Sequence, residues 1–271
     1  MKRYLTQHIV LLVLIGLLVT FFGGCRRAPL SPRLTDINTL SETAPLAALD
    51  SLSAINPDTL SDRDRNYYDF LVVKCERKAY LPIESDSLIL KVIDYASHHE
   101  KDGYYPEALY TGGLVYADIG DQPTALEYFF KANNEVSNDK SDLLLNQKIF
   151  SQIGRLLTNL RQTTQANQYI HEAVKLAKLR RDTLSIIMEN QLLARNLQRS
   201  GDFQEADSIL RTSIDMGYPA DPSRLAVTYM CLAVGLSHDQ RHEEALTAIR
   251  YCLDNVSEPS RNFDTDHKSK I

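Results

Sequence analysis

Apolar residues between positions 104 and 255 recur at the spacing of amphipathic helices, and the helical segments come in pairs. In the clearest pair, residues 104–137, a tight turn at Gly120-Asp121 separates the two segments. An alanine opens the second segment of each pair and returns about every 40 residues, as Ala125, Ala166, Ala206 and Ala245. Small residues recur in the first segments as Gly113, Gly154, Ala194 and Ala233, and late in the second as Ala132, Ala173, Ser213 and Cys252. The pattern predicts four closely packed helix pairs over residues 104–255.

Two stretches are less regular. Asn190 occupies the slot that Leu109, Phe150 and Tyr229 fill in the other pairs, which weakens the third pair as a pattern. Upstream, residues 41–103 carry apolar residues at helical spacing, beginning with Leu46 and Leu49, but lack the repeat register. This region is predicted to form divergent N-terminal helical hairpins that begin near Ser41, with Asp86 as the N-cap of a third helix.

The first 24 residues have the features of a signal peptide. Lys2 and Arg3 precede an apolar run from Ile9 to Phe22, which is short for a membrane span. The run ends in Phe22-Gly23-Gly24-Cys25, which resembles a bacterial lipobox, although Phe22 departs from the usual aliphatic residue. The resemblance implies that Cys25 is lipidated and becomes the N-terminus. A plain signal peptide and an uncleaved anchor are the alternatives.

The residues after Cys25 are predicted to connect the lipid to the fold. Pro29 and Pro32 mark residues 25–40 as an extended tether. Arg26-Arg27 occupies positions where lipoprotein sorting signals carry acidic residues, which favours the periplasmic face of the outer membrane. At the other end, residues 256–271 are polar and patternless, and they are predicted to be a disordered tail.

Composition narrows the function classes. The net charge of −5 gives no reason to expect a nucleic-acid partner, and 44% hydrophobic residues suit a folded helical body. The four cysteines form no CxxC pair. Apart from Cys25, they are interpreted as small buried hydrophobes, with a Cys231–Cys252 disulfide as the alternative.

The helix pairs resemble tetratricopeptide (TPR) repeats in spacing and residue types, although the usual repeat is shorter, about 34 residues. With the lipobox, the layout resembles TPR lipoproteins of the Bacteroidetes type. The resemblance implies an all-α, right-handed superhelical solenoid of antiparallel helix pairs. Longer relatives continue into a transmembrane helix, a coiled coil or an output module. The extra residues in each repeat are expected to lengthen the second helix or the link to the next pair.

No motif indicates catalysis, a cofactor or a small-molecule substrate; GxSxG, HExxH, P-loop and GxGxxG patterns are all missing. His238 and His242 have metal-ligand spacing, but the repeat register puts them on opposite sides of a turn. No metal site is therefore expected, and the chain is predicted not to be an enzyme.

The resemblance places one face of each first helix in a concave groove. The middle two repeats would contribute basic and amide side chains there, and the flanking repeats more apolar ones, such as Leu114 in the first. The groove residues singled out are Lys148, Arg155, Asn159, Gln191, Arg195, Arg199 and Met230. Guanidinium groups beside an asparagine suit a peptide carboxylate or acidic side chains. The alternative is a solvated helix face without a defined ligand.

The sequence thus favours a non-enzymatic scaffold, anchored to a membrane of the cell envelope, that binds a protein or peptide partner in its groove. One alternative is a sensory or regulatory TPR domain without its output module. Another is an accessory subunit of an outer-membrane assembly or uptake complex.

Overall fold

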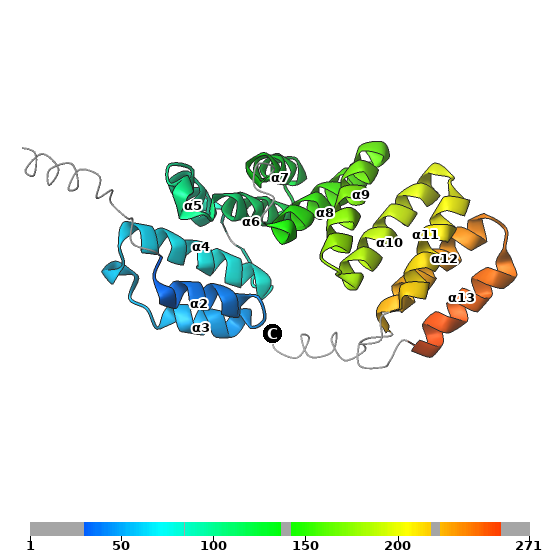
Figure 1. The fold of residues 1–271 in the computed structure, drawn as a ribbon, viewed down its shortest axis with the longest axis horizontal. Helices are drawn as coiled ribbons and strands as arrows, with labels where there is room; N and C mark the ends of the chain where they lie inside the picture. Colours follow the sequence, from blue (N-terminus) through cyan, green and yellow to red (C-terminus); the bar gives the residue numbers. More distant parts are fainter. Residues whose placement is uncertain (1–29, 84, 137–141, 218–222, 256–271) are drawn as a thin grey trace, which may run out of the picture. The chain divides into compact units, whose positions relative to one another are not determined.

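The computed structural model describes residues 30–83, 85–136, 142–217 and 223–255. The described residues form twelve α-helices and two short 3₁₀ helices, with no strand (Figure 1). They divide into two compact units, the first ending at Tyr80 and the second starting at Leu81, and each unit is described by itself. The predicted signal peptide, Cys25 and the tail 256–271 lie outside the described residues.

The first unit is a packed group of three helices. They are α2 (Pro32–Ser41), α3 (Pro45–Ser53) and α4 (Asp62–Lys78), with a 3₁₀ turn η1 (Pro57–Thr59) between α3 and α4. Each helix contacts the other two. Leu34, Leu52, Phe70 and Leu71 are fully buried, so all three helices contribute to one core.

Helix α2 corrects the prediction that residues 25–40 form an extended tether. Pro32 begins this helix rather than breaking the chain, because the first helical position needs no backbone N–H donor. Leu34, Ile37 and Ser41 are spaced along one face and are all buried. The folded part of the chain therefore begins about ten residues before the predicted start.

Charged groups tie the end of α2 to α4. Lys74 is buried, and its Nζ donates to Asn38 Oδ1 at 2.7 Å and pairs with Glu42 at 2.9 Å. Lys78 pairs with the second carboxylate oxygen of Glu42 at 2.7 Å. Beside them, burial raises the pKa of the Cys75 thiol to about 11, which makes it a poor nucleophile at neutral pH.

The second unit is a row of helices in which each contacts its neighbours in sequence (Figure 1). It begins with α5 (Ser87–Ser97) and a 3₁₀ turn, η2 (Glu100–Asp102). The helix pairs that follow are α6 (Tyr105–Asp118) with α7 (Gln122–Val136), α8 (Leu143–Asn159) with α9 (Thr163–Leu179), α10 (Thr183–Ser200) with α11 (Phe203–Met216), and α12 (Ser223–His238) with α13 (His242–Asn255). The predicted all-α stack of helix pairs is confirmed.

The unit boundary differs from the predicted one at residue 103. Helix α5 packs against α6 and belongs with the repeats, because Ile93 of α5 reaches Gly112 on α6.

The extra residues of each repeat are not confined to the second helix and the link that follows it, where they are predicted. Helices α8 and α9 have 17 residues and α10 has 18, whereas α6 and α11 have 14, so first helices are lengthened as well as second ones.

Small residues allow the paired helices to approach closely. A Cβ added to Gly113 would lie 2.6 Å from the ring of Phe129, and one added to Gly154 would lie 2.7 Å from Ile170. Phe129 and Ile170 are fully buried. The repeating glycine slot is thus explained by contact between α6 and α7 and between α8 and α9.

The turn within each pair has the same geometry in all four repeats. Gly120, Arg161, Gly201 and Gln240 occupy the same repeat position, and all have φ between 60° and 89°. The next residue donates its N–H to a first-helix carbonyl at 2.9 Å in every case, which is the Schellman pattern. Two of these left-handed positions are therefore occupied by residues with a side chain.

Asn190 does not disrupt the third pair. Its Nδ2 donates to Ser213 Oγ at 3.0 Å, and both side chains are buried. Ser213 fills the slot held by alanine in the first two pairs, so two polar exceptions satisfy each other. Asp86 is the N-cap residue of α5, as predicted, but its side chain makes no cap bond and instead accepts a hydrogen bond from Tyr116 at 2.6 Å.

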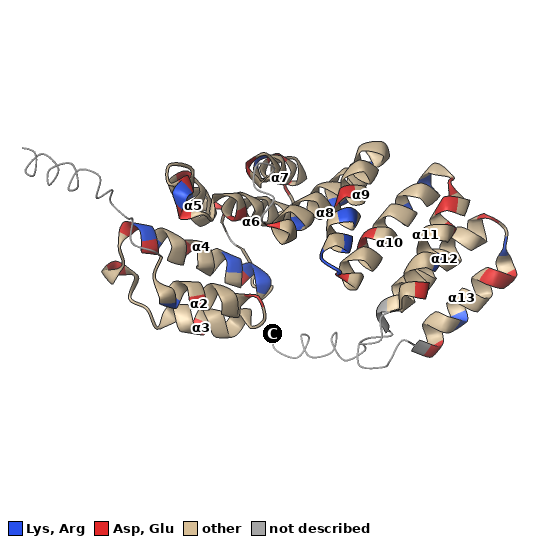
Figure 2. Cartoon of the chain, viewed as in Figure 1, with Lys and Arg blue, Asp and Glu red and all other residues tan. Residues whose placement is uncertain are grey.

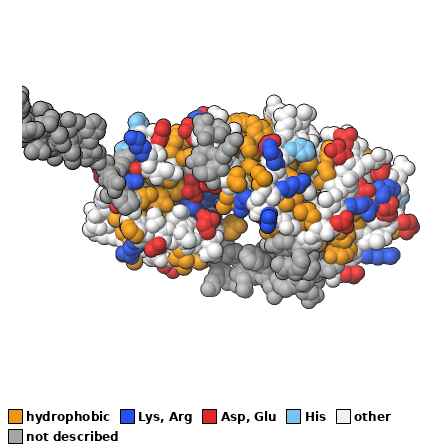
Figure 3. All heavy atoms as spheres, in the orientation of Figure 1, with side chains coloured by type: hydrophobic (Ala, Val, Ile, Leu, Met, Phe, Trp, Pro, Cys, Tyr) orange, Lys and Arg blue, Asp and Glu red, His pale blue; other side chains and the backbone are white. Residues whose placement is uncertain are grey.

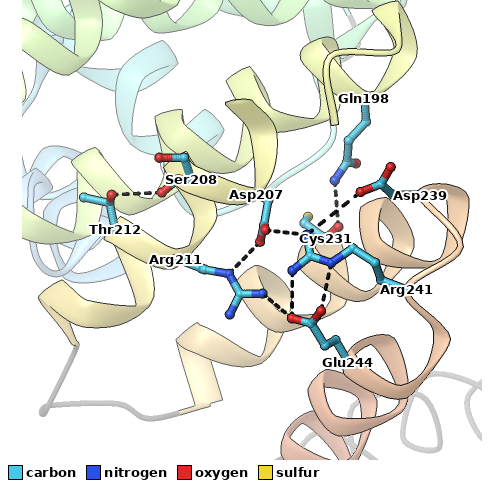
Figure 4. Close-up of polar contacts among 9 residues, drawn as sticks. All are labelled: Gln198, Asp207, Ser208, Arg211, Thr212, Cys231, Asp239, Arg241 and Glu244. Atoms are coloured by element: carbon cyan, nitrogen blue, oxygen red, sulfur yellow. Dashed lines mark hydrogen bonds and ion pairs between the residues drawn. The ribbon is translucent and has the colours of Figure 1, made fainter. Parts of the chain in front are cut away.

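Acidic and basic residues are interspersed along the helices (Figure 2). One group links the third and fourth pairs: Arg241 pairs with Asp207 and Glu244 at 2.8 Å each, and Arg211 pairs with the same two carboxylates (Figure 4). The hydrogen bonds from Arg241 lower the pKa of Glu244. Arg211, Arg241 and Glu244 are 35–50% exposed, so solvent screens these ion pairs and each adds little stability.

Candidate functional site

Four of the seven predicted groove residues line one hollow in the second unit. Arg155 and Asn159 come from the end of α8, and Arg195 and Arg199 from the equivalent positions of α10. The hollow has a volume of about 410 Å³. The remaining lining residues are Ala117, Asp118, Gln122, Leu156, Thr158 and Leu192. We call this hollow the arginine pocket.

Repeat geometry explains why these residues meet. Arg155 and Arg195 hold the same slot in consecutive first helices, and so do Asn159 and Arg199. Arg155 and Asn159 are about one helical turn apart on α8, and so are Arg195 and Arg199 on α10. The two residues on each helix therefore lie on the same face of it. The stacking of α8 beside α10 then places two rows of polar side chains next to each other.

The arginine pocket is cationic. Its lining includes three guanidinium groups and one carboxylate, that of Asp118. Arg155 donates to its helix neighbour Gln152, and Arg199 donates to the Thr158 carbonyl over a long 3.5 Å. Among the described residues, Arg195 forms no ion pair. Several guanidinium donors therefore remain available to an anionic ligand.

A buried glutamate adjoins the arginines. Glu189, on α10, is 5% exposed, and its carboxylate accepts a hydrogen bond from Ser151 of α8. Burial raises the pKa of Glu189, while the Ser151 bond and the charge of Arg155 act in the opposite direction. Glu189 was not among the predicted groove residues. A charged residue inside an otherwise apolar helix face is the only sequence signal that could have identified it.

Three predicted groove residues lie outside the arginine pocket. Lys148 is half-buried near the start of α8. Gln191 donates its Nε2 to Thr228 Oγ1 at 2.8 Å, so its amide joins α10 to α12. Met230 holds the corresponding slot on α12 and is 49% exposed. Leu114, expected to face the groove, is 6% exposed and belongs to the core instead.

The same helix face becomes apolar toward the fourth pair. The slots of Lys148, Ser151 and Arg155 on α8 are held by Val227, Met230 and Val234 on α12. These three α12 side chains are 46–55% exposed. Figure 3 shows Lys and Arg side chains over the region that Figure 1 labels α8 to α10, with exposed hydrophobic atoms beside them. A ligand extending from the arginine pocket toward α12 would meet an apolar surface.

The remaining candidate groups have structural partners. His238 ends α12, His242 begins α13, and the His238 ring stacks on Phe203. His98 and His99 contact backbone carbonyls of their own helix at 2.8 Å. Cys231 and Cys252 are free thiols, and Cys252 contacts the Ala226 carbonyl.

The described residues contain no cluster of three or more His, Cys, Asp or Glu side chains suited to a metal ion. None of the described helices combines the length and hydropathy that crossing a bilayer would require.

Comparison with known proteins identifies the fold only. No family model and no curated protein matches the chain. Among solved structures, the apo form of RapI has a TM-score of 0.66 at 14% identity, with 82% of this chain aligned to 64% of that one. A putative kinesin light chain with TPR-like repeats from Podosopora anserina gives 0.61 at 13%, covering 72% and 96%. BtubC from P. vanneervenii gives 0.61 at 13%, covering 82% and 86%.

The chain thus spans just under two thirds of the length of RapI. The matched structures include proteins described by their TPR-like repeats, and together with the four stacked helix pairs they establish a TPR-like helical repeat fold.

Proposed function

We propose that this protein is a membrane-anchored TPR-like scaffold that binds a protein partner through an acidic peptide segment in the arginine pocket. The observation that carries the proposal is the convergence of Arg155, Arg195 and Arg199 with Asn159 around one open hollow. Guanidinium groups and an amide are donors matched to carboxylate oxygens. An extended peptide could place an acidic side chain or its terminal carboxylate there.

The fold comparisons support this choice of ligand class. One similar structure is a Rap protein complexed with Competence and Sporulation Factor, with a TM-score of 0.56 at 16% identity. Solenoids of helix pairs present extended concave surfaces, which suit a peptide or protein segment. That this chain also binds a polypeptide is part of our proposal.

The membrane part of the proposal depends on Cys25 and the apolar segment before it. Thiol and N-terminal acyl chains would each add about 0.8 kcal/mol of membrane affinity per buried methylene, so several chains anchor a protein durably. We place the chain in the cell envelope, at the periplasmic face of the outer membrane, because Arg26 and Arg27 replace the acidic residues of sorting signals.

Photocrosslinking in intact cells tests both parts. A photoreactive amino acid at Asn159, on the exposed rim of the pocket, should crosslink a discrete partner in the membrane fraction. The crosslink should disappear in the Arg155→Ala/Arg195→Ala variant, and Cys25→Ala should move the protein out of the membrane fraction. The same photoreactive residue at Lys175, exposed on α9, is the matched control.

Equal crosslinking of a partner from position 159 and from position 175 would contradict the assignment of the arginine pocket as the binding site. Crosslinking that persists in the Arg155→Ala/Arg195→Ala variant would contradict it as well. Continued membrane association of Cys25→Ala would contradict the lipid anchor without affecting the pocket assignment.

A further inference from the structure

The first helix of the fourth pair carries exposed apolar side chains on the face that it shares with the arginine pocket. Val227, Met230 and Val234 of α12 are 55%, 49% and 46% exposed. Their spacings of three and four residues place them on one face of the helix, and we call them the α12 strip. The stretch from Leu225 to Ser237 contains no charged residue, whereas the solvent-facing side of a helix normally carries charged and polar residues.

The exposure of the α12 strip is a property of this helix face rather than of its place in the row. Met188 holds the slot of Val227 on α10, and it is 54% exposed although α12 packs against α10. On α8 the slot of Val234 is held by Arg155, which lines the pocket although two further pairs follow. The packing of successive pairs therefore leaves this face of the first helices open to a ligand.

Contacts between α10 and α12 place the strip at the edge of the pocket. Arg195 lines the pocket. Burial raises the pKa of the Cys231 thiol on α12, and the charge of Arg195 acts in the opposite direction, so this guanidinium lies close to α12. Gln191 donates to Thr228 Oγ1 at 2.8 Å, and Gln198 donates to the Cys231 carbonyl at the same distance (Figure 4). These two amides hold α12 beside α10, so the cationic pocket adjoins an apolar surface.

The separation of the two surfaces defines a spacing in the ligand. Packed helices lie about 8–10 Å apart, so the middle of the arginine pocket, between α8 and α10, is about 12–15 Å from α12. An extended peptide advances about 3.3 Å per residue and spans this separation in about four residues. Side chains four residues apart lie on the same side of an extended chain. One side of a short extended segment can therefore reach both surfaces.

We propose that the ligand is a bipartite peptide, in which an acidic residue enters the arginine pocket and an apolar side chain about four residues away packs on the α12 strip. This inference rests on the proposed function, because it takes the arginine pocket as the site of the carboxylate. The second contact supplies selectivity that charge alone does not, since acidic segments without the apolar residue would leave the strip uncovered.

Fluorescence anisotropy with the full-length chain in mild detergent tests the proposal. The probes are peptides of glycine and serine that carry one pair of adjacent glutamates, with a single leucine on either side of the pair. A leucine four residues from the pair should strengthen binding at least about fivefold over serine at that position, because it covers half-exposed apolar side chains. A leucine directly beside the pair cannot reach the strip and should have little effect.

Substitutions on the strip locate the contact. Met230→Gln/Val234→Thr should remove the gain from leucine and leave the affinity for the serine peptide unchanged. Leu179→Gln, at a leucine 65% exposed on α9, is the matched control and should retain the gain. Circular dichroism would verify that both variants remain helical.

The outcomes separate this inference from the proposed function. Equal affinity for the leucine and serine peptides, or a gain that persists in Met230→Gln/Val234→Thr, would overturn the bipartite ligand and leave the arginine pocket assignment intact. Failure of every acidic peptide to bind would overturn the proposed function and this inference together. Undiminished binding of the leucine peptide by Arg155→Ala/Arg195→Ala would overturn the carboxylate site, and with it the bipartite ligand.

Discussion

Individual side chains decide how the repeat pattern becomes a stable and specific surface. Asn190 is a poor residue for an apolar slot, yet its partner Ser213 lies in another repeating column that also departs from its usual residue. The two exceptions lie 23 residues apart in the chain. Only the folded arrangement of α10 against α11 shows that they compensate each other.

Glu189 yields a prediction at the residue scale. Its raised pKa means that the folded state holds the proton more tightly than the unfolded chain does. The associated stabilisation is complete below the ordinary value of 4.5 and is lost as the pH rises through the folded-state pKa. Glu189→Gln should therefore raise the melting temperature at pH 7.5, because the amide avoids the cost of a buried charge and still accepts from Ser151.

The difference between Glu189→Gln and wild type should shrink as the pH is lowered toward 4.5, where the glutamate also becomes neutral. Thermal unfolding followed by circular dichroism across this range measures it. Glu172, which is exposed and pairs with Lys175, gives the control, because Glu172→Gln should leave the melting temperature nearly unchanged. A lower melting temperature for Glu189→Gln at neutral pH would contradict this interpretation.

At the scale of elements, helices were predictable where the apolar period was strong and uncertain where proline was involved. The four pairs from Tyr105 onward follow the repeat register closely. The sequence does not predict helix α2, because Pro32 is compatible both with a break in the chain and with the first position of a helix. Whether it starts or interrupts a helix depends on burial of Leu34 and Ile37, which is a tertiary property.

The turns within the pairs give the second prediction. Gln240 adopts a φ of 60°, at the position where the first and third pairs have glycine. A left-handed conformation costs a residue with a side chain about 1–2 kcal/mol, and glycine's extra chain entropy offsets about 0.5–1 kcal/mol of the gain. Gln240→Gly should thus stabilise the protein by roughly 0.5–1 kcal/mol in urea unfolding.

The reciprocal change provides the comparison. Gly201→Gln should destabilise the protein by a similar amount, since no atom lies within 4 Å of a Cβ added there and only the φ of 88° opposes it. If both substitutions shifted stability in the same direction, backbone conformation would not be the controlling factor at this turn.

At the scale of the whole molecule, the register predicted the arginine pocket better than it predicted the groove as a whole. Arg155, Asn159, Arg195 and Arg199 converge because identical slots on stacked helices lie side by side. Gln191 instead bonds to Thr228, and Leu114 is buried. The rotation of each helix about its axis decides whether a side chain lines the pocket, bonds to the next helix or is buried. This rotation depends on packing between the pairs rather than on repeat spacing.

The central claim is that the arginine pocket recognises carboxylate groups of a peptide. Fluorescence anisotropy with matched peptide pools, one containing Asp and Glu with a free C-terminus and the other containing Asn and Gln with an amidated C-terminus, tests it most directly. The account predicts binding of the acidic pool that weakens with salt and falls at least about tenfold in Arg155→Ala/Arg195→Ala. Lys131→Ala/Lys175→Ala, which removes equal charge from α7 and α9, should bind normally. Equal binding of both pools, or undiminished binding of the acidic pool by the arginine variant, would contradict the account.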